Sequence, residues 1–308
     1  MGRSRRPAAD GGPAVDPVAA AVFDAVAAAA PEVRAELPGR RVESGTENAS
    51  GETVMAADLY ADAVLGDAIT AVDGVGSFVS EERDAVVDAG GAVEDGDGPP
   101  YAVAVDPLDG SSNLRSNNAM GTVVGVYDAP LPASGRDLVA AGYVLYGPIT
   151  TMVVADDAGV RETVIESDGD GGIDRSVVED DLTIPSEPTV YGFGGRVPDW
   201  PADFRTYARA VEDELKLRYG GAMVGDVNQV LTYGGVFGYP ALADAPDGKL
   251  RLQFEANPIA YVIERAGGAS SDGTASVLDA EPETVHGRTP LYVGNDALID
   301  RLETALGD

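Results

Sequence analysis

One segment constrains the fold of this chain more than any other: an apolar run that ends abruptly in acidic residues. Residues 101–105 read YAVAV, and Asp106 and Asp109 follow at once in the sequence DPLDGSSNL. A short apolar run bounded by turn residues predicts a buried strand. A buried strand requires a sheet covered by other elements, so the chain is expected to fold in layers, with two carboxylates at the end of one strand.

The remaining elements are expected to alternate between helix and strand. Helices are predicted at 16–30, 52–69, 201–216, 223–232, 257–266 and 295–306. Strands are predicted at 76–80, 101–105, 121–127, 138–146, 150–155, 189–193, 236–239, 250–254 and 290–293. Residues 1–13 are expected to be disordered, and the acidic, glycine-rich stretch 167–181 is expected to be a loop. This order implies a layered α/β (α+β) fold in two subdomains.

Composition excludes several classes of function. The chain has 52 acidic and 21 basic residues, which gives a formal charge of −31 and makes nucleic acid an unsuitable partner. No cysteine is present and His286 is the single histidine, so thiolate and histidine-rich zinc sites are excluded. A serine hydrolase triad would have to use His286, which lies in a polar stretch with no serine elbow beside it.

The acidic excess with ordinary apolar content is typical of a folded protein with an acidic surface, suited to a salt-rich cytoplasm. No stretch reaches the length of a membrane span, and we expect a cytoplasmic protein.

Further acidic residues follow apolar runs. Glu81 and Glu82 follow the strand 76–80, and Glu255 closes the alternating strand 250–254. Carboxylates gathered at strand ends would repel one another unless a hard cation such as Mg²⁺ or Mn²⁺ lies between them. The turn at 110–113 offers N–H and hydroxyl donors to a phosphate, so the pattern favours metal-assisted phosphoryl chemistry. Each segment also has an ordinary interpretation: an acidic β-turn, a surface pair of glutamates, or a charge at a helix start.

At this level of detail the sequence resembles class I fructose-1,6-bisphosphatase, within the lithium-sensitive sugar-phosphatase and inositol-monophosphatase superfamily, in an acidic version like those of haloarchaea. The resemblance runs from about Glu47 to Val293. It is carried by FVSEE (78–82), DPLDGSSNL (106–114), RYGGAMVGDVNQVLTYGGVFGYP (218–240) and GKLRLQFEANPIAYVIERAGG (248–268). It implies a layered αβαβα sandwich with a metal-binding subdomain, 14–186, and a substrate-binding subdomain, 187–308.

The resemblance also implies a role for individual residues. The implied metal ligands are Glu81, Glu82, Asp106, Asp109, Glu255 and the carbonyl of Leu108. Activation of water is implied for Glu52, Asp58 and Glu82, with Glu52 standing where the family has an aspartate. Substrate contacts are implied for Gly110, Ser111, Ser112, Arg218, Tyr219, Tyr239 and Lys249. Gly194 and Val197 replace an asparagine and a tyrosine of the family, which weakens the expectation of strict substrate selectivity.

The implied activity is hydrolysis of the 1-phosphate of fructose 1,6-bisphosphate to fructose 6-phosphate, a step of gluconeogenesis, with two or three Mg²⁺ ions and Mn²⁺ as the other candidate. Arg218 matches an arginine that reaches a neighbouring subunit, which implies a homo-oligomer, a dimer or a tetramer. Three alternatives remain open: a sedoheptulose-1,7-bisphosphatase, a broad sugar or inositol monophosphatase, and a non-catalytic cation-binding protein.

Overall fold

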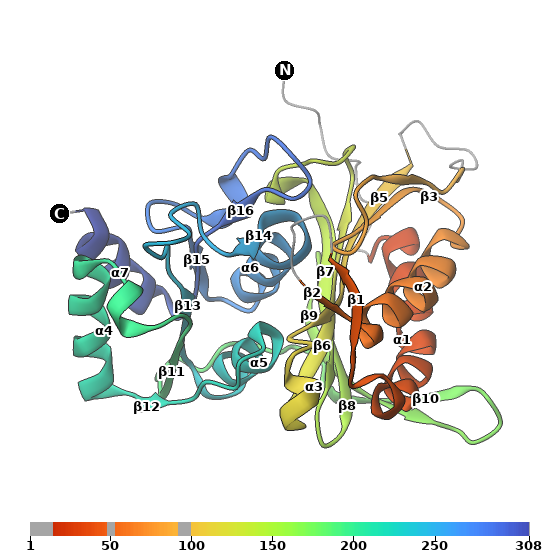
Figure 1. Ribbon diagram of the computed structural model, residues 1–308, viewed down its shortest axis with the longest axis horizontal. Coiled ribbons are helices and arrows are strands. Elements are labelled where there is room, and N and C mark those ends of the chain that lie inside the picture. Colours follow the sequence, from red (N-terminus) through yellow and green to blue (C-terminus); the bar gives the residue numbers. More distant parts are fainter. Residues whose placement is uncertain (1–14, 48–52, 92–99, 308) are drawn as a thin grey trace.

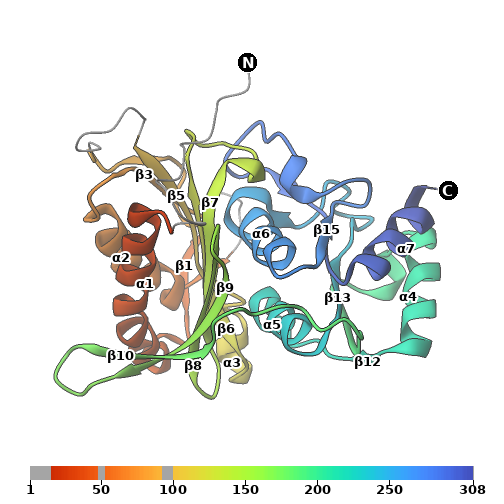
Figure 2. The same ribbon diagram turned by 180° about the vertical axis from the view of Figure 1, so that it is seen from behind.

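The computed structural model describes residues 15–47, 53–91 and 100–307. Helices and sheets alternate in five layers, which Figure 1 shows edge-on, and Figure 2 shows the same layers from behind. The α-helices are α1 (Pro17–Glu36), α2 (Ala56–Thr70), α3 (Asn113–Ser116), α4 (Ala202–Glu214), α5 (Met223–Tyr233), α6 (Asn257–Arg265) and α7 (Asp296–Gly307). The layered α/β fold predicted from the sequence is confirmed.

The larger sheet contains eight strands within the described residues. In spatial order they are β10 (Ile173–Glu179), β9 (Gly159–Ser167), β8 (Thr150–Asp156), β7 (Leu138–Tyr146), β6 (Met120–Tyr127), β5 (Tyr101–Asp109), β3 (Val75–Ser80) and β4 (Val87–Asp88). Only β3 and β5 pair in parallel; the other neighbours are antiparallel. The parallel pair brings the ends of β3 and β5 to the same edge of the sheet, with Glu81 directly after β3 and Asp106 and Asp109 on β5.

The smaller sheet contains five strands within the described residues. Their order is β12 (Lys216–Leu217), β11 (Val190–Phe193), β13 (Gly235–Tyr239), β17 (Leu291–Gly294) and β15 (Ala269–Ser271). Two short ribbons complete the described strands: β1 (Glu43–Glu47) with β2 (Thr53–Met55), and β14 (Leu250–Arg251) with β16 (Arg288–Thr289).

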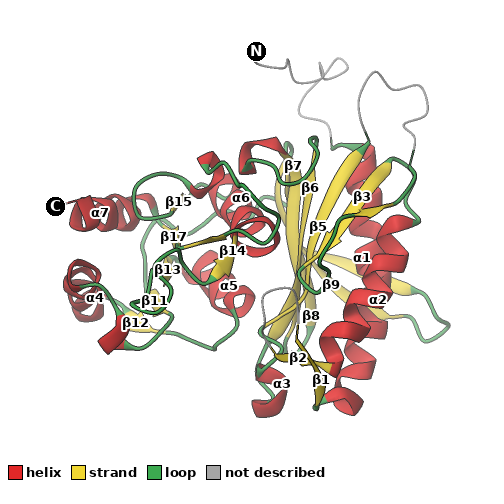
Figure 3. Ribbon diagram, turned by 45° about the horizontal axis from the view of Figure 1, so that its top comes forward, coloured by secondary structure: helices red, strands yellow, loops and turns green. Residues whose placement is uncertain are grey.

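Helices cover both faces of each sheet. α1 and α2 pack on one face of the larger sheet, while α5 and α6 pack between the two sheets (Figure 3). α4 and α7 cover the far face of the smaller sheet. One hydrophobic core therefore joins residues of both sheets through α5 and α6, including Val79, Phe237 and Ile259. A strand buried between two helical layers can be apolar throughout, which explains the YAVAV run of β5.

The start of α1 follows the prediction closely. The Asp16 carboxylate accepts hydrogen bonds from the N–H groups of Val18 and Ala19, at 2.9 and 3.1 Å, and Pro17 occupies the first helical position. Among the described residues, no helix combines the length and the apolar character needed to cross a bilayer.

Several predicted boundaries are wrong: the helix predicted at 16–30 continues to Glu36, and the helix predicted at 201–216 ends at Glu214. Three further differences each have a local reason. Residues 167–181 were predicted to be a loop, but Ile173–Glu179 forms β10 on the exposed edge of the larger sheet, where polar residues are tolerated. The predicted helix 52–69 begins at Ala56, because residues 53–55 pair with β1. The predicted strand 250–254 ends after Arg251 and continues as a π-helix, Leu252–Ala256, so Glu255 lies on a helical turn rather than at a strand end.

Candidate active site

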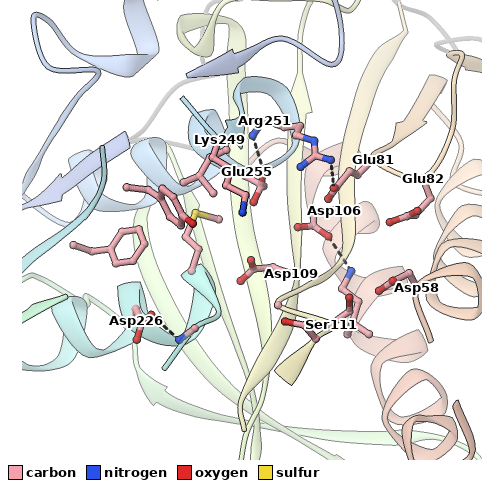
Figure 4. A pocket seen from close by; sticks show the side chains of 18 of the residues that line it. Asp58, Glu81, Glu82, Asp106, Asp109, Ser111, Asp226, Lys249, Arg251 and Glu255 are labelled. Carbon is pink, nitrogen blue, oxygen red and sulfur yellow. Dashed lines mark hydrogen bonds and ion pairs between the residues drawn. The ribbon is translucent and has the colours of Figure 1, made fainter. Parts of the chain in front are cut away.

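A cleft of about 300 Å³ lies where the edge carrying β3 and β5 faces the π-helix and the smaller sheet (Figure 4). Residues far apart in the sequence line it. They are Val54, Asp58, Glu81, Glu82, Asp106, Leu108, Asp109, Gly110, Ser111, Ser112, Tyr219, Gly221, Met223, Asp226, Phe237, Tyr239, Lys249, Leu250, Arg251 and Glu255. The cleft therefore gathers most of the residues that the sequence singled out.

Three buried carboxylates form its centre. Asp106, Asp109 and Glu255 each present one oxygen to a point where these oxygens lie within 4.8 Å of one another. A backbone N–H group donates to one oxygen of each carboxylate. Asp106 accepts from Leu108 at 3.0 Å, Asp109 from Val224 at 2.7 Å, and Glu255 from Arg251 at 2.6 Å. Each of the three side chains is thus oriented by a main-chain hydrogen bond.

Burial and mutual repulsion oppose ionisation of this cluster. Burial, followed by the charges of Glu81 and its neighbours, raises the pKa of Asp106 and the pKa of Glu255 well above the usual carboxyl range. Burial raises the pKa of Asp109 to about 7, although its hydrogen bond from Val224 acts in the opposite direction. Burial and the charge of Glu81 raise the pKa of Glu82 to about 8.

One cation of the chain partly offsets this repulsion. Arg251 is 4 % exposed, and its Nη2 lies 2.8 Å from Oε1 of Glu81. The pair joins the segment before the π-helix to the residue that follows β3. Truncating either partner would leave the other charge buried and uncompensated.

Asp58 and Ser111 form the rim next to this cluster. Asp58, in the first turn of α2, accepts the N–H of Met55 at 2.7 Å and the hydroxyl hydrogen of Ser111. Burial raises its pKa to about 6, because desolvation exceeds the effect of these hydrogen bonds. A carboxylate that titrates near neutral pH and opens onto the cleft is suited to accept a proton.

The turn after β5 lies beside the cluster. Gly110 adopts a φ of +73°, and a Cβ atom there would lie 2.2 Å from the Cβ of Ala222, so both the conformation and the close approach require glycine. The carbonyl of Leu108 accepts the N–H of Ser111 at 3.1 Å, and its second lone pair is the part a cation could use. Ser112 completes the donors of this turn.

The opposite wall comes from the smaller sheet. Tyr239 is half-buried at the end of β13, and the Lys249 ammonium lies 6.0 Å from the centre of its ring. A side chain at Gly194 would meet the Tyr239 ring at 2.4 Å, so the absence of a side chain at this position makes room for the tyrosine. Tyr219 also lines the cleft and is 45 % exposed.

One described residue that the sequence singled out lies outside this lining, and a second cannot be placed. Arg218 is exposed and is absent from the lining, so its assigned contact with a neighbouring subunit stays a prediction. Glu52 lies outside the described residues.

Sequence reasoning missed Asp226 and Arg251. Asp226 is 3 % exposed and accepts the N–H groups of Gly220 and Gly221, at 2.6 and 3.3 Å, which holds the turn after Tyr219. Its signal was an acid on the apolar face of the amphipathic helix 223–232. The sequence feature that could have indicated Arg251 is a basic residue within an apolar stretch, in a chain with few basic residues.

The donor set fits hard divalent cations. Oε2 of Glu82 is buried and has no hydrogen-bond partner in the described part of the chain, and Glu82 lines the same cleft as the three converging carboxylates. Oxygen ligands of this kind, with neither thiol nor imidazole among the residues described as lining the cleft, suit Mg²⁺ or Mn²⁺ better than zinc.

Comparisons with known proteins agree along most of the chain. Residues 21–171 match the family model "Fructose-1-6-bisphosphatase, N-terminal domain", and residues 184–307 match "Fructose-1-6-bisphosphatase, C-terminal domain". A class 1 fructose-1,6-bisphosphatase of Natronomonas pharaonis is 61 % identical over 285 residues, covering 92 % of this chain and 97 % of that protein. One of Halobacterium salinarum is 61 % identical over 288 residues, covering 94 % and 97 %.

A solved structure shares the fold. The holo form of Leishmania major fructose-1,6-bisphosphatase superposes with a TM-score of 0.85 at 27 % identity, covering 95 % of this chain and 96 % of that one. A layered α/β fold with an acid-lined cleft of this kind defines a metal-dependent phosphatase. The chain belongs to the class I fructose-1,6-bisphosphatase family, whose reaction is hydrolysis of fructose 1,6-bisphosphate to fructose 6-phosphate.

Proposed function

We propose that this chain hydrolyses the 1-phosphate of fructose 1,6-bisphosphate at the cleft, as a step of gluconeogenesis in a salt-rich cytoplasm. The observation that carries the proposal is the convergence of the oxygens of Asp106, Asp109 and Glu255 within 4.8 Å. The same cleft is lined by tyrosine and lysine side chains that could donate hydrogen bonds to a phosphate. The metal dependence of the family and the acidic surface of the chain support it.

The proposed ligands are Asp106, Asp109, Glu255, Glu81, Glu82 and the Leu108 carbonyl. Mg²⁺ is the proposed ion, two or three per site, with Mn²⁺ as the substitute. Bound divalent cations withdraw charge from phosphate oxygens and acidify water.

The chain's own groups would orient the reactants. The 1-phosphate would lie against the turn of Gly110, Ser111 and Ser112, and the Ser112 hydroxyl and N–H groups of this turn would donate to its oxygens. Asp58 and Glu82, on one side of the cluster, accept the proton of the attacking water, with Glu52 proposed to assist. Burial raises the pKa of Asp58 to about 6, which suits a proton acceptor near neutral pH, whereas Glu82, with a pKa of about 8, would need the positive charge of a bound cation to be ionised there.

The second phosphate would lie on the far wall. Tyr219 and Tyr239 offer hydroxyl donors there, and Lys249 offers a positive charge in a chain with two lysines. We further propose a dimer or tetramer, because exposed Arg218 next to Tyr219 suits a contact with a neighbour's phosphate.

A substrate panel tests the proposal. Phosphate release is measured with Mg²⁺ on fructose 1,6-bisphosphate, sedoheptulose 1,7-bisphosphate, fructose 1-phosphate and inositol 1-phosphate, each with and without a chelator. We expect the highest kcat/KM on fructose 1,6-bisphosphate and loss of activity on chelation. A higher value on sedoheptulose 1,7-bisphosphate or on a monophosphate would assign the chain to that activity, and no release from any substrate would leave a cation-binding protein.

A further inference from the structure

His286, the chain's single histidine, lies outside the cleft lining but contacts two of the three segments that carry the proposed metal ligands. Its loop leads into β16. On one side, its Nε2 lies 3.0 Å from the carbonyl oxygen of Arg83, directly after Glu81 and Glu82. A carbonyl oxygen only accepts, so the ring carries hydrogen on Nε2 and donates it.

On the other side, the ring packs on the segment that carries Glu255. Its centroid lies 5.2 Å from that of Phe254, which is fully buried in the π-helix next to Glu255. The following residue, Gly287, accepts the N–H of Leu252 at 2.8 Å, at the start of the same π-helix. One short segment is thus bonded to the π-helix and, through the imidazole, to the turn after β3.

The turn after β3 depends on its backbone for position. Oε2 of Glu82 is buried with no hydrogen-bond partner among the described residues, so no contact of that oxygen fixes the side chain. The backbone N–H of Glu82 donates to Oγ of Ser80 at 3.2 Å. Nε of Arg83 donates to both carboxylate oxygens of Asp62, at 3.1 and 2.9 Å. All of these contacts remain within the larger sheet and α2.

Among the described residues, an ion pair and a hydrogen bond cross from this turn to the π-helix side. Arg251 binds Glu81 through a carboxylate oxygen, which is an atom that a cation would also use. The His286 contact uses only a main-chain carbonyl. It can hold the turn at a fixed separation from Glu255 without itself occupying a carboxylate oxygen.

We propose that His286 is a positioning residue that sets the spacing between the Glu81–Glu82 turn and Glu255, and thereby the affinity for divalent cations. The proposal rests on the metal roles given under the proposed function. Loss of one such hydrogen bond should weaken cation binding by about 3- to 10-fold, with little change in kcat at saturating cation.

Binding of Mn²⁺ without substrate tests this directly, by calorimetry or by the electron paramagnetic resonance of free Mn²⁺. His286→Phe keeps the ring on Phe254 and removes the donor, and it should raise the Kd. His286→Gln places an amide N–H at a similar reach and should bind Mn²⁺ as the wild type does. His286→Asn is too short to reach Arg83 and should behave like His286→Phe, which gives a second loss variant should the first not fold.

Tyr207→Phe is the matched control. Its hydroxyl donates to the Leu298 carbonyl at 3.0 Å in the outer helical layer, so the variant loses a comparable bond far from the cleft. We expect a lower Tm with unchanged Mn²⁺ affinity. Wild-type affinity in both His286→Phe and His286→Asn, or equal weakening in Tyr207→Phe, overturns the positioning role. Absence of Mn²⁺ binding by the wild type would instead overturn the proposed function.

Discussion

Acidic residues occur in two very different settings, the cleft and the outer surface. In the cleft, Asp106 and Asp109 are 3 % and 7 % exposed, held by backbone N–H groups, and have raised pKa values. On the surface, Glu214 pairs with Arg301 at 2.8 Å, with about half of each side chain exposed, and its arginine lowers its pKa. The same functional group is a candidate ligand only where water is excluded and like charges converge.

Asp109 is the buried acid whose replacement should have the largest effect. Asp109→Asn keeps an acceptor for the Val224 N–H but removes one ligand charge, so kcat should fall by more than about 10³-fold. Without metal, the variant should unfold at a temperature no lower than that of the wild type, because a repelling charge is gone. Activity assays and calorimetry without metal check both points. Retained activity would contradict the assignment of Asp109.

Asp58 gives the next largest effect. Asp58→Asn can still accept the Met55 N–H, so α2 should remain capped while the proton acceptor is lost. We expect kcat to fall by about 100-fold with KM nearly unchanged. Steady-state kinetics at saturating Mg²⁺ measure this, and a rise in KM alone would reassign Asp58 to substrate binding.

The two lysines extend the comparison to positive charge. Lys249 lines the cleft, whereas Lys216 lies on the exposed edge strand β12. Lys249→Met should raise KM for the bisphosphate by about 10-fold and for monophosphates much less, because the second phosphate loses its charged donor. Lys216→Met should change neither value by more than about twofold. Equal effects on both substrates would remove the proposed role of Lys249.

The smallest effect is expected at the surface. Glu214→Gln breaks an exposed pair whose attraction is screened by salt, so Tm should change by less than about 2 °C and kcat/KM should not change. Thermal unfolding at low and at high salt measures it. A large loss of stability at high salt would contradict the view that exposed acidic residues contribute little to the stability of the fold.

Much of the secondary structure could be predicted from short sequence patterns. The cap at Asp16, the apolar strand of β5 and the amphipathic helix α5 each carry their signal within a few residues. β10 was not readable, because an edge strand exposed to water has the composition of a loop. The π-helix at Glu255 was not readable either, because the alternation in RLQF mimics a strand.

The candidate site was predicted unevenly for a similar reason. Acids that end an apolar run stand out, so Asp106 and Asp109 could be found without a structure. Arg251 could not be assigned, because its partner Glu81 lies 170 positions away in the chain and the meeting depends on how the two sheets pack. Asp226 is held by the backbone of the turn that it stabilises, a contact that depends on how the chain enters α5.

The placement of α5 and α6 between the two sheets has a consequence for how the protein unfolds. A core that draws on both sheets leaves neither half with a complete apolar interior of its own. Heating should therefore melt the chain in one concerted event, and either half made separately should aggregate. Catalysis and structural integrity would then be lost together, and a gene encoding only one half would yield no working fragment.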